Sequence, residues 1–239
     1  MLHCVWLMLK AKAVLEGRAC SWLPAPKPPA MSLSPCPIYH VLYLPSLLQV
    51  LEMSPERESC LRHRLELLPR DISRLKNLTL LYMDSNNLKA IPAEIGSLRR
   101  LERLTLSNNR LSSLPPEMAA LQRLRSLHLA NNALAELPAP LCQLRGLTFL
   151  DLSDNKIHSI PSGIRHLEKL ETLLLLFNSL ESLPEDICVL RNLHTLWLGN
   201  NCLRALPASF GDPPEVTEVE LMLCKSSAQE KCVSGGKVW

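Results

Sequence analysis

Aromatic residues are scarce in this chain. They make up 4% of its 239 residues, so the core has to be aliphatic. Glycine is scarce too, with eight residues and no Gly-rich run, which argues against a phosphate-binding loop. No apolar run is long enough to cross a membrane, because the best candidate, 41–51, is short and contains Pro45. The net charge of +3 is too small an excess to indicate a nucleic-acid partner.

Motifs for catalysis and metal binding are also missing. The nine cysteines form no C-x-x-C pair, and histidines do not recur with cysteines at metal-ligand spacing. No G-x-S-x-G motif and no Cys/His pairing suggests a nucleophile, so we expect no enzyme, no metal and no cofactor. The N-terminus has no basic residue before its apolar run, unlike a secretory signal peptide, and the odd cysteine count fits reduced thiols. Both observations favour a cytoplasmic location.

What the chain does contain is a 23-residue repeat. Six blocks follow one another without insertion, starting at Leu78, Leu101, Leu124, Leu147, Leu170 and Leu193. They follow the pattern L-x-x-L-x-L-x-x-N-x-L-x-x-[IL]-P-x-x-[ILMF], with Met83 in place of the third leucine in the first block. The L-x-L segment alternates as a strand with one buried face does, and the proline suits the first turn of a short helix. Because one repeat cannot bury enough apolar surface to fold alone, we expect stacked repeats sharing a parallel sheet.

Asparagine recurs in the slot after each strand. A short amide there can donate to and accept from turn backbone that would otherwise be buried without a partner. We therefore interpret these residues as structural rather than functional: Asn86, Asn109, Asn132, Asn155, Asn178 and Asn201.

A fixed period of this length and pattern is the signature of a leucine-rich repeat solenoid. Over about residues 65–224, with its L-P-x-x-[IL]-x-x-L segment, the chain resembles intracellular leucine-rich repeat proteins of the Ras-suppressor, Shoc and Scribble-like group. The resemblance implies an α/β solenoid with a curved parallel β-sheet on the concave face and short helical or 3-10 segments on the convex face. It also implies a non-enzymatic scaffold or adaptor, with several members acting in small-GTPase signalling. Unlike the larger members, this chain has no recognisable second interaction domain.

The two ends of the chain fit the repeat poorly. We expect residues 1–54 to be a non-globular, Pro-rich segment in which a short helix over 45–53 is allowed by the spacing of its leucines. The repeat domain should span 55–224 and be followed by a disordered tail, 225–239. Within it we assign a degenerate repeat, complete repeats and a partial terminal repeat, at 55–77, 78–215 and 216–224. The degenerate repeat fits either a cap or a truncated product without independent function.

The candidate binding site lies in the strand slots that face away from the core. Four of the five aromatic residues between positions 78 and 223 fall in such concave slots. Together with two leucines, three of them should form an apolar patch across the fourth to sixth blocks, namely Phe149, Leu174, Leu176, Phe177 and Trp197. Asp151, His128 and Glu220 border this patch, and Tyr82 lies in the same column nearer the N-terminus. Exposed aromatic clusters with a polar rim are typical of protein-binding hot spots.

The sequence therefore predicts a protein-interaction module that binds a protein partner on its concave face. Two alternatives concern the patch: Phe177 packs into the spine of the turns, or the N-terminal segment or a second copy covers the patch. Two others concern function: a secreted or cell-surface ligand-binding solenoid, or a truncated isoform.

Overall fold

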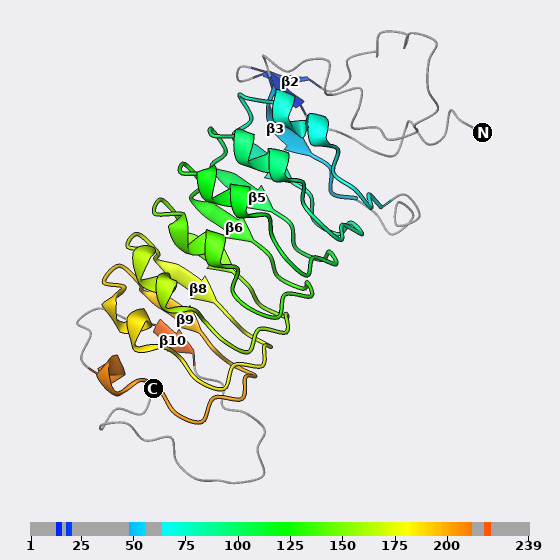
Figure 1. Cartoon of the computed structure of the whole chain (residues 1–239). Coiled ribbons are helices and arrows are strands. Elements are labelled where there is room, and N and C mark those ends of the chain that lie inside the picture. The colour runs from blue at the N-terminus through cyan, green and yellow to red at the C-terminus, as the bar shows by residue number, and fades with distance from the viewer. Residues whose placement is uncertain (1–12, 16–17, 21–47, 56–63, 212–217, 221–239) are drawn as a thin grey trace.

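The computed structural model describes residues 13–15, 18–20, 48–55, 64–211 and 218–220 (Figure 1). One ten-stranded sheet runs the length of a solenoid, in the order β10-β9-β8-β7-β6-β5-β4-β3-β1-β2. Neighbouring strands from β3 to β10 are parallel. Short helices form a row alongside the sheet in Figure 1. The predicted α/β solenoid, with a parallel sheet on one side and short helices on the other, is confirmed.

Each strand of the regular repeats is three residues long. They are β4 (Leu80–Tyr82), β5 (Arg103–Thr105), β6 (Ser126–His128), β7 (Phe149–Asp151), β8 (Thr172–Leu174), β9 (Thr195–Trp197) and β10 (Glu218–Glu220). Register partners are 23 positions apart, as Leu81 with Leu104 and Leu104 with Leu127. The central leucine of each strand from β4 to β9 is fully buried. Because side chains alternate along a strand, the residues on either side of it face the concave surface.

The convex segments are 3-10 helices. They are η2 (Arg70–Arg74), η3 (Ala93–Ser97), η4 (Pro116–Ala120), η5 (Ala139–Gln143), η6 (Ser162–His166), η7 (Glu185–Val189) and η8 (Ala208–Gly211). From η2 to η7 the repeat proline comes directly before the helix, as in η3, where Pro92 has φ −69° and ψ 149°. The proline is therefore the N-cap residue and not part of the first turn, and its ring fixes φ at the value found. Glu94 lies in that first turn, where the unpaired N–H groups favour a negative charge.

The repeat asparagines join each repeat to the one before it. In Asn109 the Nδ2 atom donates to the carbonyls of Leu106 in its own repeat and Met83 in the preceding one, each at 3.0 Å. Its Oδ1 atom accepts the backbone N–H of Leu88 at 3.1 Å. The same bonds recur at the other five positions, Asn86, Asn132, Asn155, Asn178 and Asn201.

The first repeat begins earlier than the sequence pattern indicated. Strand β3 (Leu48–Glu52) pairs in parallel with β4, with Val50 opposite Leu80. The helix expected over 45–53 is therefore wrong for Leu48–Glu52. An extended segment is favoured because it supplies partners for the open edge of β4: the Thr79 N–H donates to the Gln49 carbonyl, and the Met53 N–H to the Tyr82 carbonyl, each at 2.8 Å.

This first repeat is longer than the others. Leu48, Leu51 and Met53 are buried in the leucine slots of the strand half, and Leu65 and Leu68 continue the pattern. Its register offset to β4 is 30 positions rather than 23, so seven extra residues lie between Met53 and Leu65. Asn86 makes the same hydrogen bonds to this repeat that the other repeat asparagines make to the repeats before them. Its Nδ2 atom donates to the Met53 carbonyl at 3.1 Å, and its Oδ1 atom accepts the Leu65 N–H at 3.0 Å.

The N-terminal edge of the sheet is covered by a short hairpin. Strands β1 (Ala13–Leu15) and β2 (Arg18–Cys20) pair with each other, and β1 pairs with β3, all antiparallel. The expectation that residues 1–54 lie outside the fold is thus wrong for 48–54 and for these two strands. The rest of that segment and the predicted tail, 225–239, lie outside the described residues. In the described part of the chain, no helix has the length and hydropathy needed to span a membrane.

Candidate protein-binding site

The apolar patch, defined as Phe149, Leu174, Leu176, Phe177 and Trp197, lies where strands β7 to β9 and their following turns meet the concave surface. Register places Leu174 directly between Asp151 and Trp197. All five patch residues keep part of their surface exposed to solvent, although they belong to repeats whose core leucines are fully buried. The structure therefore brings the predicted residues of this patch to one surface.

Phe177 is the most exposed member of the patch and has an unusual backbone. Its side chain is 57% exposed, and its φ is 53°, in the left-handed region. The same slot has a positive φ in five other repeats, where short polar residues occupy it, namely Ser85, Asn108, Asn131, Asp154 and Asn200. Asparagine, aspartate and serine bear this conformation at low cost, whereas a bulky aromatic side chain is an outlier there. The alternative that Phe177 packs into the spine of the turns is wrong.

Trp197 is half-buried at the C-terminal side of the patch. Its indole ring lies in the register column between Leu174 and Glu220. The Nε1 atom is buried and has no hydrogen-bond partner among the residues that the structure describes. A buried donor without an acceptor is energetically costly.

His128 and Asp151 form the N-terminal border of the patch. The imidazole ring stacks on Phe149 with ring centroids 4.7 Å apart and planes inclined by 30°. The Nε2 atom of His128 and the hydroxyl of Ser126 are hydrogen bonded at 2.9 Å. Burial lowers the pKa of His128 more than the nearby carboxylate of Asp151 raises it, and Arg103 lowers it further. The ring is therefore neutral at pH 7 and extends the apolar surface of Phe149.

Tyr82 does not join the patch. In the register column, Thr105 lies between Tyr82 and His128, and Thr105 is buried. Its hydroxyl donates to Asp84 Oδ2 at 2.5 Å, and the Ser107 N–H donates to Oδ1 of the same carboxylate at 2.7 Å. This hydrogen-bonded polar strip separates Tyr82 from the apolar surface.

Other features of this surface were not identified from the sequence. Asp154 and Glu171 are exposed beside the patch. In the sequence, only a count of acidic against basic residues in the concave positions would have identified them. Two further exposed apolar side chains lie elsewhere: Leu67, 72% exposed, in the turn before η2, and Val189, 57% exposed, in η7. The sequence signal for Val189 is that other repeats hold polar or small residues in its slot.

The site offers an apolar surface with polar side chains at its border. Within the described ranges, no group of three or more His, Cys, Asp or Glu side chains is arranged to hold a metal ion. The hydrogen-bonded pair of Ser126 and His128 comes from alternate residues of one strand, and its ring is occupied in stacking on Phe149. The pair shapes the border of the patch.

Comparison with known families identifies the repeat. The leucine rich repeat family model matches in three overlapping stretches, residues 76–134, 99–157 and 122–180. The chain has the fold of a leucine-rich repeat solenoid, and residues 76–180 match that family. Repeats of this kind present an extended concave surface to other molecules. No curated protein matches the chain significantly.

Solved leucine-rich repeat structures share this architecture. A leucine-rich repeat protein of Leptospira interrogans is 32% identical with a TM-score of 0.54, over 71% of this chain and 53% of its own. The plant peptide hormone receptor RGFR1, solved in complex with RGF2, is 25% identical with a TM-score of 0.61, over 76% of this chain and 34% of its own. An internalin of Listeria monocytogenes is 22% identical with a TM-score of 0.55, over 77% of this chain and 57% of its own, and supports the fold alone. The solenoid thus spans between a third and about half the length of the first two proteins.

Proposed function

We propose that this leucine-rich repeat solenoid is a protein-interaction module whose partner binds the apolar patch. Leucine-rich repeat domains generally bind proteins, and the concave surface is the one their curvature offers. The observation that carries the proposal is Phe177, an aromatic side chain that is exposed and held at a φ of 53° in a slot otherwise filled by short polar residues. Strained, exposed residues of this kind occur at ligand-contacting sites.

Affinity capture with the full chain tests this proposal. Trp197→Ala and Leu174→Glu should each abolish capture of the partner while leaving thermal melting nearly unchanged. Leu67→Glu is the matched control, because it also alters an exposed apolar side chain but lies away from the concave surface. Capture that survives both patch substitutions, or is lost equally with Leu67→Glu, would contradict the proposal.

We further propose a cytoplasmic scaffold or adaptor role, with a small GTPase as the first partner to test. This rests on the resemblance to the Ras-suppressor, Shoc and Scribble-like group. Free thiols at Cys142, Cys188 and Cys202 are consistent with a reducing compartment, and burial raises the pKa of Cys142 to about 11, which keeps it unreactive. Titration of the chain with purified small GTPases in their two nucleotide states is the direct test; no binding to either state would rule out this partner class.

A second candidate function is ligand binding outside the cell. It is favoured by the similarity to the plant receptor, which was solved in complex with RGF2. Non-reducing mass spectrometry of the natural protein distinguishes the two. A processed N-terminus with paired cysteines would support export, and free cysteines would support the cytoplasmic proposal.

A further inference from the structure

The concave surface around the apolar patch differs in charge from the rest of the chain. We define the acidic stripe as the strand and turn positions 148–155, 171–178 and 194–201. It contains three carboxylates and no lysine or arginine, whereas the whole chain carries 26 basic and 23 acidic residues. The three are Asp151, Asp154 and Glu171.

The carboxylates nearest the apolar patch are available to a partner. Asp154 and Glu171 are exposed, and neither is in an ion pair within the described part of the chain. Asp154 occupies the left-handed slot one repeat before Phe177, so the two side chains project from equivalent turns of adjacent repeats. The basic residues around the stripe lie outside it, Arg165 in η6 and the others in the flanking loops: Arg145, Lys156, Lys169, Arg191 and Arg204.

The apolar centre of the stripe is small. Strands β7 to β9 span two inter-strand spacings, about 10 Å. That width suits one or two large side chains of a partner. The carboxylates at the margins then lie within reach of neighbouring residues of the same partner segment.

We propose that the apolar patch takes a basic peptide segment of a partner protein, in which arginine or lysine flanks one or two large apolar side chains. This inference rests on the proposed function and specifies the chemistry of the partner. The apolar anchor contacts Leu174, Phe177 and Trp197, and the flanking cations pair with Asp154 and Glu171. Opposite charges at the rim favour this class and disfavour acidic segments.

Selection from a displayed library of short random peptides tests the inference on the full chain. Binders are counter-selected on Phe177→Asn, which removes the aromatic side chain but places in the slot the residue that Asn108, Asn131 and Asn200 already provide. Peptides that depend on Phe177 should be enriched in arginine or lysine beside large apolar residues. Their affinity should fall as salt concentration rises.

A charge-only variant sharpens the test. Asp154→Asn with Glu171→Gln keeps shape and left-handed tolerance while removing two charges, and should weaken the selected peptides about tenfold. Glu66→Gln with Glu136→Gln is the matched control, since both residues are exposed and lie outside the acidic stripe. This control should leave affinity unchanged.

The possible failures are distinguishable. Phe177-dependent peptides that lack basic residues, or that are insensitive to the charge-only variant, would overturn the basic-partner inference and leave the proposed function standing. Complete absence of Phe177-dependent peptides would also overturn the inference. The proposed function fails separately, if affinity capture is unchanged by Trp197→Ala and Leu174→Glu.

The chain's own first residues are a competing occupant, because 1–12 reads MLHCVWLMLKAK and combines apolar residues with Lys10 and Lys12. These residues lie outside the described part of the structure. A chain lacking them should bind the selected peptides as the full chain does. A gain of about tenfold on their removal would instead indicate self-coverage and overturn the assignment to a separate partner.

Discussion

At the scale of the residue, one turn position distinguishes the residue that is available for binding from those that only stabilise the fold. The turn after each strand requires a left-handed residue, and five of the six positive-φ positions hold serine, asparagine or aspartate. Phe177 is the exception, and its side chain lies outside the buried core because it is 57% exposed. Stability alone would favour asparagine at this position.

Phe177→Asn should therefore raise the free energy of unfolding by about 1 kcal/mol, since it relieves left-handed strain without removing a buried contact. Urea unfolding measures this, and Asn131→Phe, which introduces the same strain in an equivalent turn, should lower stability by a similar amount. A loss of stability in Phe177→Asn would mean that the aromatic ring packs within the fold.

The repeat asparagines behave in the opposite way. Asn155 is buried and donates to the carbonyls of Leu129 and Leu152 at 3.0 and 3.1 Å, while accepting the Leu134 N–H at 3.1 Å. Asn155→Ala leaves these backbone groups without partners and should cost about 2–4 kcal/mol in unfolding free energy. Asn192→Ala, at an exposed site, should cost less than about 1 kcal/mol. Equal effects of the two substitutions in denaturant unfolding would contradict the structural role of Asn155.

At the scale of the element, the convex helices pack unequally. A Cβ atom on Gly96 in η3 would clash with the Glu117 carbonyl oxygen in η4, which is backbone and cannot rotate away. On Gly163 in η6 it would lie 3.1 Å from Cys142 Cβ, a contact that a small shift relieves. The η3 and η4 helices are thus packed directly against each other at Gly96.

Gly96→Ala should destabilise the protein by about 1–3 kcal/mol, because η3 and η4 have to move apart. Gly163→Ala should cost less, since only a modest adjustment of the Cys142 side chain is needed. Thermal unfolding of the two variants side by side tests the difference, and the expectation fails if Gly163→Ala is the more damaging.

The regular elements could be predicted from the sequence because each repeat presents the same leucines at the same spacing. Strand β3 could not, since its pattern of Leu48, Leu51 and Met53 begins 30 positions before the next repeat rather than 23. A fixed 23-residue period places the first strand at 55–60 instead. Leu48 and Leu51 also fit one face of a helix. The patch was predictable from slot positions, but the left-handed backbone at Phe177 and the separation of Tyr82 by Thr105 depend on turn geometry and hydrogen bonding that spacing does not reveal.

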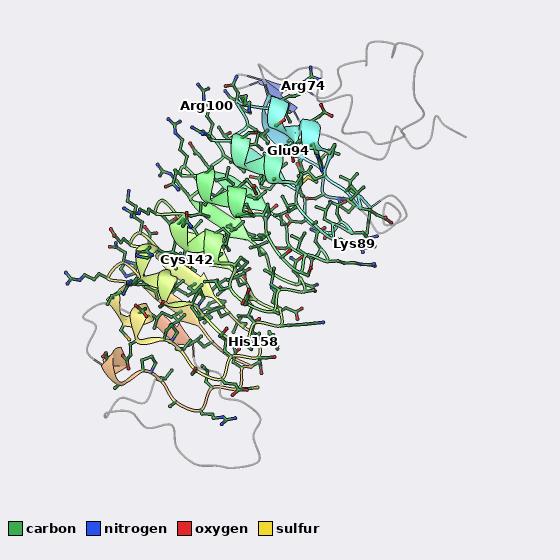
Figure 2. The ribbon with its side chains drawn as sticks, in the orientation of Figure 1. Arg74, Lys89, Glu94, Arg100, Cys142 and His158 are labelled. Atoms are coloured by element: carbon green, nitrogen blue, oxygen red, sulfur yellow. The ribbon has the colours of Figure 1, made fainter. Side chains whose placement is uncertain are left out.

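At the scale of the whole molecule, a repeat touches only its neighbours, as the register of the sheet and the row of helices in Figure 1 indicate. Figure 2 shows side chains projecting outward along the solenoid, with Arg74 and Arg100 near the N-terminal repeats and His158 nearer the C-terminal ones. Stability in such an array is a sum of local and nearest-neighbour contributions. Damage at one end should therefore remain local.

Leu51→Asp places a charge at a fully buried position of β3 and should open the N-terminal repeats. Hydrogen exchange measured by mass spectrometry should then show faster exchange in β3 and β4, with β8 and β9 still protected. Loss of protection along the entire solenoid would mean that the repeats unfold as one unit.

The hydrogen bonds of the repeat asparagines make the two ends of the solenoid different. The Oδ1 atom of Asn201 accepts the Leu180 N–H at 3.1 Å, so the turn of one repeat is completed by the side chain of the next. A chain that ends before Asn201 would lack the acceptor of the Leu180 N–H. The turn that contains Leu180 would then lose a stabilising hydrogen bond, and disorder at the C-terminal end would extend one repeat further into the solenoid. Shortening the array at its C-terminal end therefore leaves a backbone donor without its acceptor, whereas shortening it at its N-terminal end removes acceptor carbonyls, such as that of Met83 for Asn109 Nδ2 and that of Leu88 for the Arg110 N–H.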